Sequence, residues 1–144
     1  MEKLFNTEFE FSLRILLLLS SLKSPMSQDT IRDLDLLTTY GKEFNISNKN
    51  LHGDKSYSIS ELQTRHALVN SALKELVKDG LVDVIRSSKG FQYKISEEGI
   101  RYRNNLSSDY SKEYISELDK ILSFTRNMSE KELHQFTYNQ GLRR

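Results

Sequence analysis

Residues 61–99 constrain the fold of this chain more than any other stretch, because they contain a long helix, a hairpin and the start of another helix in direct succession. Apolar side chains recur at helical spacing up to Gly80, and glycine commonly ends a helix in the left-handed conformation. Residues 87–90 (Ser-Ser-Lys-Gly) provide a four-residue connection that suits a β-hairpin. The apolar positions of the expected helix are Leu62, Val69, Leu73, Leu76 and Val77. These residues predict a long amphipathic helix that leads directly into two antiparallel strands.

The second expected strand indicates which side of the hairpin faces the core. Phe91, Tyr93 and Ile95 alternate with polar residues, which is the period of a strand with one buried face. Ser96 follows in a position that suits the N-cap of another helix. A helix followed by an antiparallel hairpin is the second half of a winged-helix domain. We therefore predict a mainly α fold with a small β-hairpin (α+β), whose winged-helix domain reads nucleic acid or docks on another protein.

The residues before this unit predict two helices. Thr7 and Glu10 have the spacing of a capping box and open a first helix that runs to about Leu22. Pro25 breaks this helix, and Ser27 suits the N-cap of a second one. An Asn-, Ser- and Lys-rich stretch over residues 42–60 then predicts an extended loop, far longer than the turn of about 3–4 residues in a helix-turn-helix. The sequence does not assign a role to this loop.

The residues after the hairpin predict further helices. One extends from Ser96 to about Leu106, and Ser129 with Glu132 repeats the capping box before a last one. Between them, an amphipathic helix is marked by Tyr110, Tyr114, Leu118, Ile121 and Leu122. We predict a winged-helix domain over residues 1–107 and a C-terminal helical extension over residues 108–144 that packs on it.

The first expected helix is apolar on nearly all sides, which is typical of a helix that is central in a core or shared with a partner. We expect one side to be buried and the other to form a partner interface with another subunit or a second copy. The expected buried side carries Phe9, Leu13 and Leu16. The expected interface consists of Phe11, Ile15, Leu18 and Leu22. The alternative is that the C-terminal helices cover this second side within one chain.

The polar side of the long helix is the candidate DNA-binding surface. Amides can pair with base edges in the major groove, and lysines contact phosphates. The candidate residues are Gln63, Thr64, Asn70, Ser71, Lys74 and Lys78 on the helix, with Arg86 and Lys89 on the wing. The alternative is an ordinary solvated face, since Glu75 and Asp79 dilute the charge and the net charge of the chain is only +1. We therefore expect any DNA binding to be weak and sequence-tolerant.

The sequence contains no pattern of residues that predicts catalysis, a metal or a cofactor. Phosphate-binding glycine loops and nucleophile motifs are missing, and the 3 histidines lack the spacing of metal ligands. The absence of cysteine excludes disulfides and thiolate sites and fits a reducing cytoplasm. The apolar run at residues 15–19 is far shorter than the roughly 20 residues that cross a bilayer. We expect a non-catalytic, cytoplasmic protein without a membrane segment.

An ordered set of short motifs over about residues 5–99 resembles a known family. Residues 5–22 (FNTEFEFSLRILLLLSSL) are similar to an opening pattern of aromatic-Asn-Thr-x-x-Glu-Phe-x-Leu-Arg. The resemblance continues through Leu34-Asp35-x-Leu37 with Gly41, Leu51-His52, Glu61-Leu62, Arg65 and Gly80-Leu81-Val82-Asp83-Val84. In these motifs the chain resembles the small middle component of bacterial three-component ABC-ATPase systems.

This resemblance implies a non-catalytic accessory subunit. Its implied partners are a coiled-coil ABC ATPase, similar to SMC and Rad-fifty proteins, and an effector subunit, in anti-phage or anti-plasmid defence. A homodimer and direct contact with DNA are left open. The alternative function is a stand-alone winged-helix transcription regulator. A neighbouring gene for a coiled-coil ATPase would favour the accessory subunit over the regulator.

Overall fold

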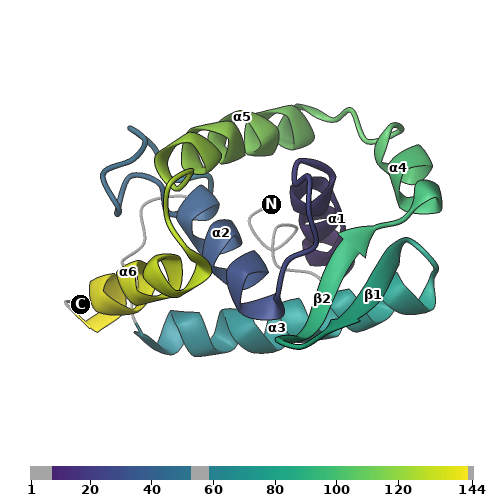
Figure 1. The fold of residues 1–144 in the computed structure, drawn as a ribbon. Coiled ribbons are helices and arrows are strands. Elements are labelled where there is room, and N and C mark those ends of the chain that lie inside the picture. Colours follow the sequence, from purple (N-terminus) through teal and green to yellow (C-terminus); the bar gives the residue numbers. More distant parts are fainter. Residues whose placement is uncertain (1–7, 53–58, 143–144) are drawn as a thin grey trace.

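The computed structural model describes residues 8–52 and 59–142, and the described part contains helices and one small antiparallel sheet. Figure 1 shows α5 and α3 on opposite sides of the molecule with α1 and α2 between them, and the hairpin and α4 at one end. The mainly α fold with a β-hairpin, expected from the sequence, is confirmed. The elements are α1 (Glu8–Ser20), α2 (Gln28–Thr39), α3 (Ile59–Lys78), β1 (Val82–Ser87), β2 (Gly90–Ile95), α4 (Glu97–Arg103), α5 (Asp109–Phe124) and α6 (Glu130–Leu142).

Side-chain caps begin most of these helices. The backbone N–H of Thr30 donates to the Ser27 hydroxyl at the start of α2, as expected. Before α6, the backbone N–H of Ser129 donates to the Glu132 carboxylate (2.8 Å) and the backbone N–H of Glu132 donates to the Ser129 hydroxyl (3.0 Å). This reciprocal pair is the predicted capping box. The capping box expected at Thr7 lies outside the described residues.

The end of α3 has the conformation predicted from Gly80, whose φ is +76°. The backbone N–H of Leu81 donates to the Leu76 carbonyl and that of Gly80 donates to the Val77 carbonyl, which together form a Schellman motif. Gly99 lies against the same turn, because a Cβ there would come within 2.1 Å of the Leu81 carbonyl oxygen. The closeness of α4 to the end of α3 therefore requires glycine at position 99.

The hairpin differs from its prediction in two respects. Ser87 pairs with Gly90, so the connection is a two-residue turn instead of four residues. The face expected to be buried is covered only at its base, because Ile95 is buried, Tyr93 is half-buried and Phe91 is 54% exposed. The strands extend beyond the helices that could cover them, and the wing tip is therefore exposed on both faces.

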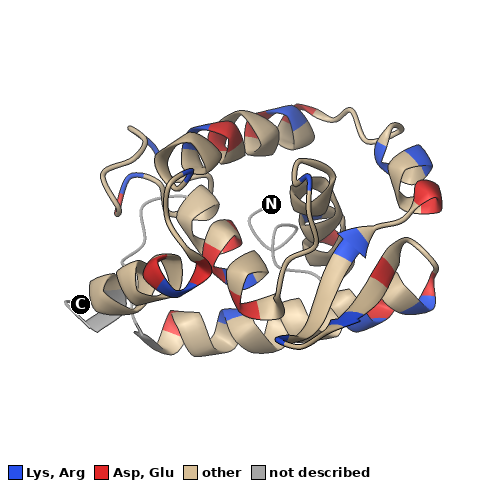
Figure 2. Cartoon of the chain, viewed as in Figure 1, with Lys and Arg blue, Asp and Glu red and all other residues tan. Residues whose placement is uncertain are grey.

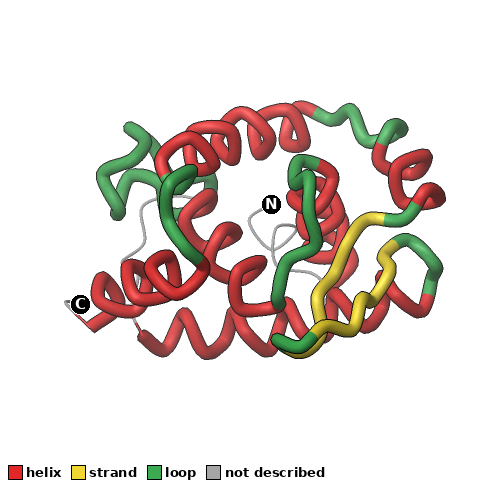
Figure 3. Tube along the Cα trace, viewed as in Figure 1, coloured by secondary structure: helices red, strands yellow, loops and turns green. Residues whose placement is uncertain are grey.

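The segment between α1 and α2 lies along the outer edge of β2 (Figure 3). Met26 and Tyr93 form an isolated antiparallel bridge, with hydrogen bonds of 3.1 and 2.8 Å between their backbones. This bridge connects the hairpin to the segment that immediately precedes α2.

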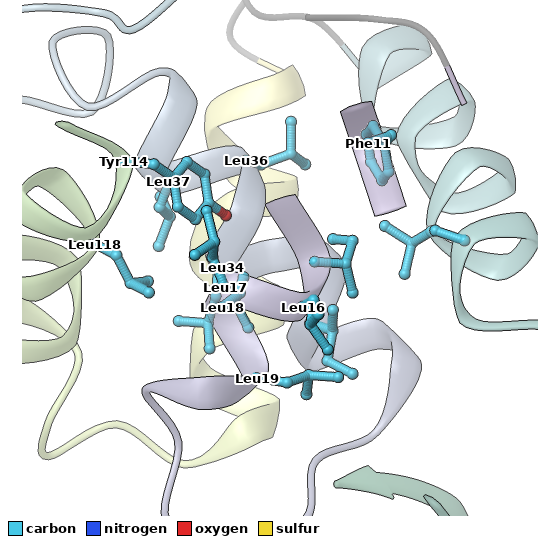
Figure 4. Packing of buried hydrophobic residues seen from close by; sticks show 14 of the residues in the cluster. Phe11, Leu16, Leu17, Leu18, Leu19, Leu34, Leu36, Leu37, Tyr114 and Leu118 are labelled. Carbon is cyan, nitrogen blue, oxygen red and sulfur yellow. The ribbon is translucent and has the colours of Figure 1, made fainter. Parts of the chain in front are cut away.

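The core is centred on α2, whose residues 30–39 are all buried. Helices α1, α3, α5 and α6 all contact α2, so no side of its C-terminal turns faces solvent. Side chains from α5 join the same cluster as those from α1 and α2 (Figure 4). The C-terminal helices thus share one hydrophobic core with the residues before them.

The interface expected on the first helix is not exposed in this fold. Phe11, Ile15 and Leu18 are at most 1% exposed, and Leu22 is half-buried against the core. Of the residues expected to be buried, Leu16 is fully buried, but Phe9 is 64% exposed and Leu13 is partly exposed, so the outer side of α1 is the one that carries Phe9 and Leu13. The prediction of which side of α1 is exposed was wrong because α3 and α5 both pack on α1 and cover the other side.

Candidate interaction site

The most unusual feature of the interior is a charged cluster centred on Asp35, which we call the Asp35 cluster: Arg14, Asp35, Glu61, Arg65 and Tyr114. Arg14 donates two hydrogen bonds to the Asp35 carboxylate, from Nε (2.8 Å) and Nη2 (2.9 Å). Arg65 Nη1 (2.6 Å) and the Tyr114 hydroxyl (2.7 Å) also donate to it. Arg65 is further paired with Glu61 at 3.1 Å. One carboxylate thereby joins α1, α2, α3 and α5.

Burial and charge act in opposite directions on the Asp35 cluster. Burial would raise the pKa of Asp35, but the guanidinium groups of Arg14 and Arg65 outweigh it and hold the pKa well below its usual range. Burial raises the pKa of Tyr110, beside this cluster, to about 12. Asp35 is therefore a permanent anion that fixes the surrounding donors and has no proton to exchange near neutral pH.

The three histidines all contact other side chains. His52 Nε2 lies 2.7 Å from the Tyr110 hydroxyl. Arg32 directs one guanidinium nitrogen to His66 Nδ1 (3.1 Å) and another to His134 Nδ1 (2.7 Å), joining α2 to α3 and α6. Among the described residues, no group of His, Cys, Asp or Glu could hold a metal ion. The three histidines therefore connect elements of the fold to one another.

The described part of the long loop packs on α5. The Ser47 hydroxyl donates to Glu117 (2.5 Å), and Lys49 forms an ion pair with Glu113. Phe44 is buried in the core. Residues 42–52 of the expected loop therefore form a compact series of turns. Residues 53–58 of that loop lie outside the described residues, and α3 begins at Ile59.

The candidate DNA-binding residues lie on the surface of α3 and the wing. Asn70 is half-buried, and the other seven are exposed. Figure 2 shows basic and acidic residues mixed along the helices and the hairpin, without a continuous basic face. The geometry places these residues where a duplex could reach them, but it does not concentrate charge there. The exposed residues are Gln63, Thr64, Ser71, Lys74, Lys78, Arg86 and Lys89.

A second exposed feature, which was not predicted from the sequence, is a pair of adjoining hollows along the outer side of α1. One, of about 360 Å³, is lined by residues of α1, the end of α3 and α4, including Phe9 and Tyr102. The other, of about 480 Å³, is lined by residues of α1 and of the α4–α5 connection. Leu13 lines both hollows. We call this continuous depression the α1 groove.

The buried ion pairs of the Asp35 cluster were also not predicted from the sequence, although the sequence contains a pattern that indicates them. Arg14 is charged, yet it is only 1% exposed. Its flanking residues, Leu13 and Ile15, continue an apolar run, and Asp35 likewise stands between leucines. Opposite charges embedded in two such apolar helices are the pattern that could have indicated a buried ion pair.

Comparison with protein families shows that the model for ABC-three component (ABC-3C) system Middle Component 2 matches residues 4–143. No curated protein and no solved structure matches the chain. Within the residues that the structure describes, no helix is long and apolar enough to span a bilayer.

Proposed function

The chain belongs to the ABC-three component system Middle Component 2 family, and from this premise we propose that it is a non-catalytic accessory subunit that links a coiled-coil ABC ATPase to an effector. The match over residues 4–143 carries the proposal, since it covers nearly the whole chain. A component of a three-component system has other subunits as partners. The SMC-like or Rad-fifty-like character of the ATPase, and a role in defence against phages or plasmids, are part of the proposal.

Two structural observations support a linking role. Arg14, Asp35 and Arg65, which lie in the family-like motifs, converge on one buried cluster. These motif residues therefore stabilise the fold. Contacts with other subunits are made by other residues, which lie at the surface. That surface offers two separate exposed features, the α1 groove and the wing tip, as a linking subunit requires. Co-purification of the chain with the other two components tests the proposal.

We also infer that residues 1–107 form a winged-helix module. The order of α1, the Met26 bridge, α2, α3 and the β1–β2 hairpin supports this inference. The exposed outer face of α3 supports it as well, because the third helix of such a module presents that face to its ligand.

The purified chain is expected to hydrolyse no ATP and to bind no stoichiometric zinc. A phosphate-binding loop is missing from the sequence, and the described histidines and carboxylates form no cluster of metal ligands. A coupled ATPase assay and elemental analysis check this expectation. ATP turnover that persists through successive purification steps would contradict the non-catalytic role.

The second candidate function is DNA reading by α3 and the wing, favoured by the exposed Lys74, Lys78, Arg86 and Lys89. If about three of these side chains contact phosphates, a plot of log affinity against log salt should have a slope of about −2.7. Replacing either Lys74 or Lys89 by alanine should then weaken binding equally on all duplex sequences. Lys112→Ala on α5, on the opposite side of the molecule from α3 (Figure 1), is the matched control. A nanomolar, sequence-dependent affinity at physiological salt would favour a transcription regulator instead.

A further inference from the structure

The α1 groove has an apolar floor and an apolar rim. Phe9, Leu13 and Leu17 follow each other at intervals of four residues, so they form one row along α1. Phe9 is 64% exposed at one end of this row, and Leu17 lies at the base of the second hollow. Tyr102 and Leu106 line the facing wall. Large exposed apolar side chains grouped in a hollow are typical of a docking site.

The charge around the α1 groove differs between its two hollows: the larger one is lined by Glu10 and by Arg14, whose guanidinium is paired with Asp35. Glu8, Glu75 and Asp79 line the hollow at the α3 end, and no lysine or arginine is among the described residues that line it. Basic residues occur at the far end, where Arg103 and Lys112 line an adjoining hollow. The α3 end of the groove therefore favours positive charge, in contrast to the mixed surface elsewhere.

We infer that the α1 groove binds an amphipathic helix of a partner subunit, whose apolar side chains fill the groove and whose lysines or arginines lie at the α3 end. The row from Phe9 to Leu17 is about 12 Å long, which corresponds to roughly two turns of helix. Docking of an apolar helix face in a groove is a common mode of recognition, and charge complementarity fixes its direction. This inference rests on the proposed function, because it assigns a binding surface to the accessory subunit.

Site-specific crosslinking in the assembled system tests the inference. A p-benzoylphenylalanine in place of Phe9 adds a photo-reactive group at the exposed end of the row, and its large apolar side chain resembles the original. The tagged chain is co-expressed with the ATPase and effector components, irradiated, and analysed by mass spectrometry. We expect a crosslink to a helix of one of these components that carries lysine or arginine beside its apolar stripe.

Two outcomes would overturn the inference while the complex still forms: a crosslink to a second copy or to residues 1–7 of the chain itself, or no crosslink at all. If the components do not assemble with the unmodified chain, the proposed function fails together with the inference. The two failures are thereby distinguishable.

Charge reversal provides an independent measurement. The double variant Glu75→Lys/Asp79→Lys is expected to weaken binding of the crosslinked component at least tenfold at low salt, with a smaller difference at high salt. The control variant Glu97→Lys/Asp119→Lys makes the same change in net charge at exposed positions that line neither hollow of the groove, and it should stay within about twofold of the wild type. Equal weakening by both variants would mean that only net charge matters, which contradicts a directed site.

Discussion

Replacing Asp35 by alanine is expected to lower the free energy of unfolding by about 3–5 kcal/mol. The substitution removes the one acceptor shared by Arg14, Arg65 and Tyr114, and it leaves two buried guanidinium groups without their main counter-ion. Since domains of this size are stable by only about 5–15 kcal/mol, the substitution should remove a large share of the total stability. Urea denaturation followed by circular dichroism measures the change.

Asp29→Ala on the same helix is the matched control. The Asp29 side chain is 59% exposed, and its ion pair with Arg32 spans 3.4 Å at the surface. Exposed pairs contribute about 0–1 kcal/mol, so this variant should unfold close to the wild-type midpoint. Equal stability of the two variants would show that the Asp35 cluster does not stabilise the fold.

The lowered pKa of Asp35 predicts how the stability of the protein depends on pH. Because the ion pairs hold the pKa of Asp35 below its usual range in the folded state, its contribution is complete above the unfolded-state pKa of about 3.9. That contribution is lost as the pH falls from there toward the lower folded-state pKa. The difference in stability between the wild type and the alanine variant should accordingly be constant from neutral pH to about pH 5 and shrink below about pH 4.

Leu18→Ala is expected to destabilise the protein by about 2–5 kcal/mol, because it opens a cavity where a fully buried side chain packs between α1 and its neighbours. Phe9→Ala, on the same helix but 64% exposed, should change stability by no more than about 0.5 kcal/mol. Urea denaturation measures the difference: if the two variants have the same m-value, the shift of the denaturation midpoint reports the change in stability. A Leu18→Ala variant that is as stable as the wild type but fails to bind its partners would restore the original prediction of an interface on that side.

The parts of the fold that were predicted correctly depend on residues close together in the chain. Ser27 and Ser129 cap helices through backbone groups three residues away, and Gly80 ends α3 through its own φ. Such features are set by local sterics and hydrogen bonding, so a single sequence contains the necessary information.

The exposed side of α1 could not be predicted in the same way. Both sides of this helix are apolar, and the helices that cover one of them, α3 and α5, lie far along the chain. The buried pairing of Arg14 with Asp35 likewise joins residues separated by 21 positions. Which apolar side faces the core is therefore decided by long-range packing, and the α1 groove became visible only in the folded chain.

The most direct test of the proposed linking role is whether the ATPase and effector components associate without this chain. The three purified components are mixed in pairs and together, and the masses of the complexes are determined by size-exclusion chromatography with light scattering. We predict that the chain binds each of the other two components, and that these two elute as one complex only when it is present. A stable complex of the ATPase and the effector that forms without the chain, and that the chain does not join, would contradict the proposed function.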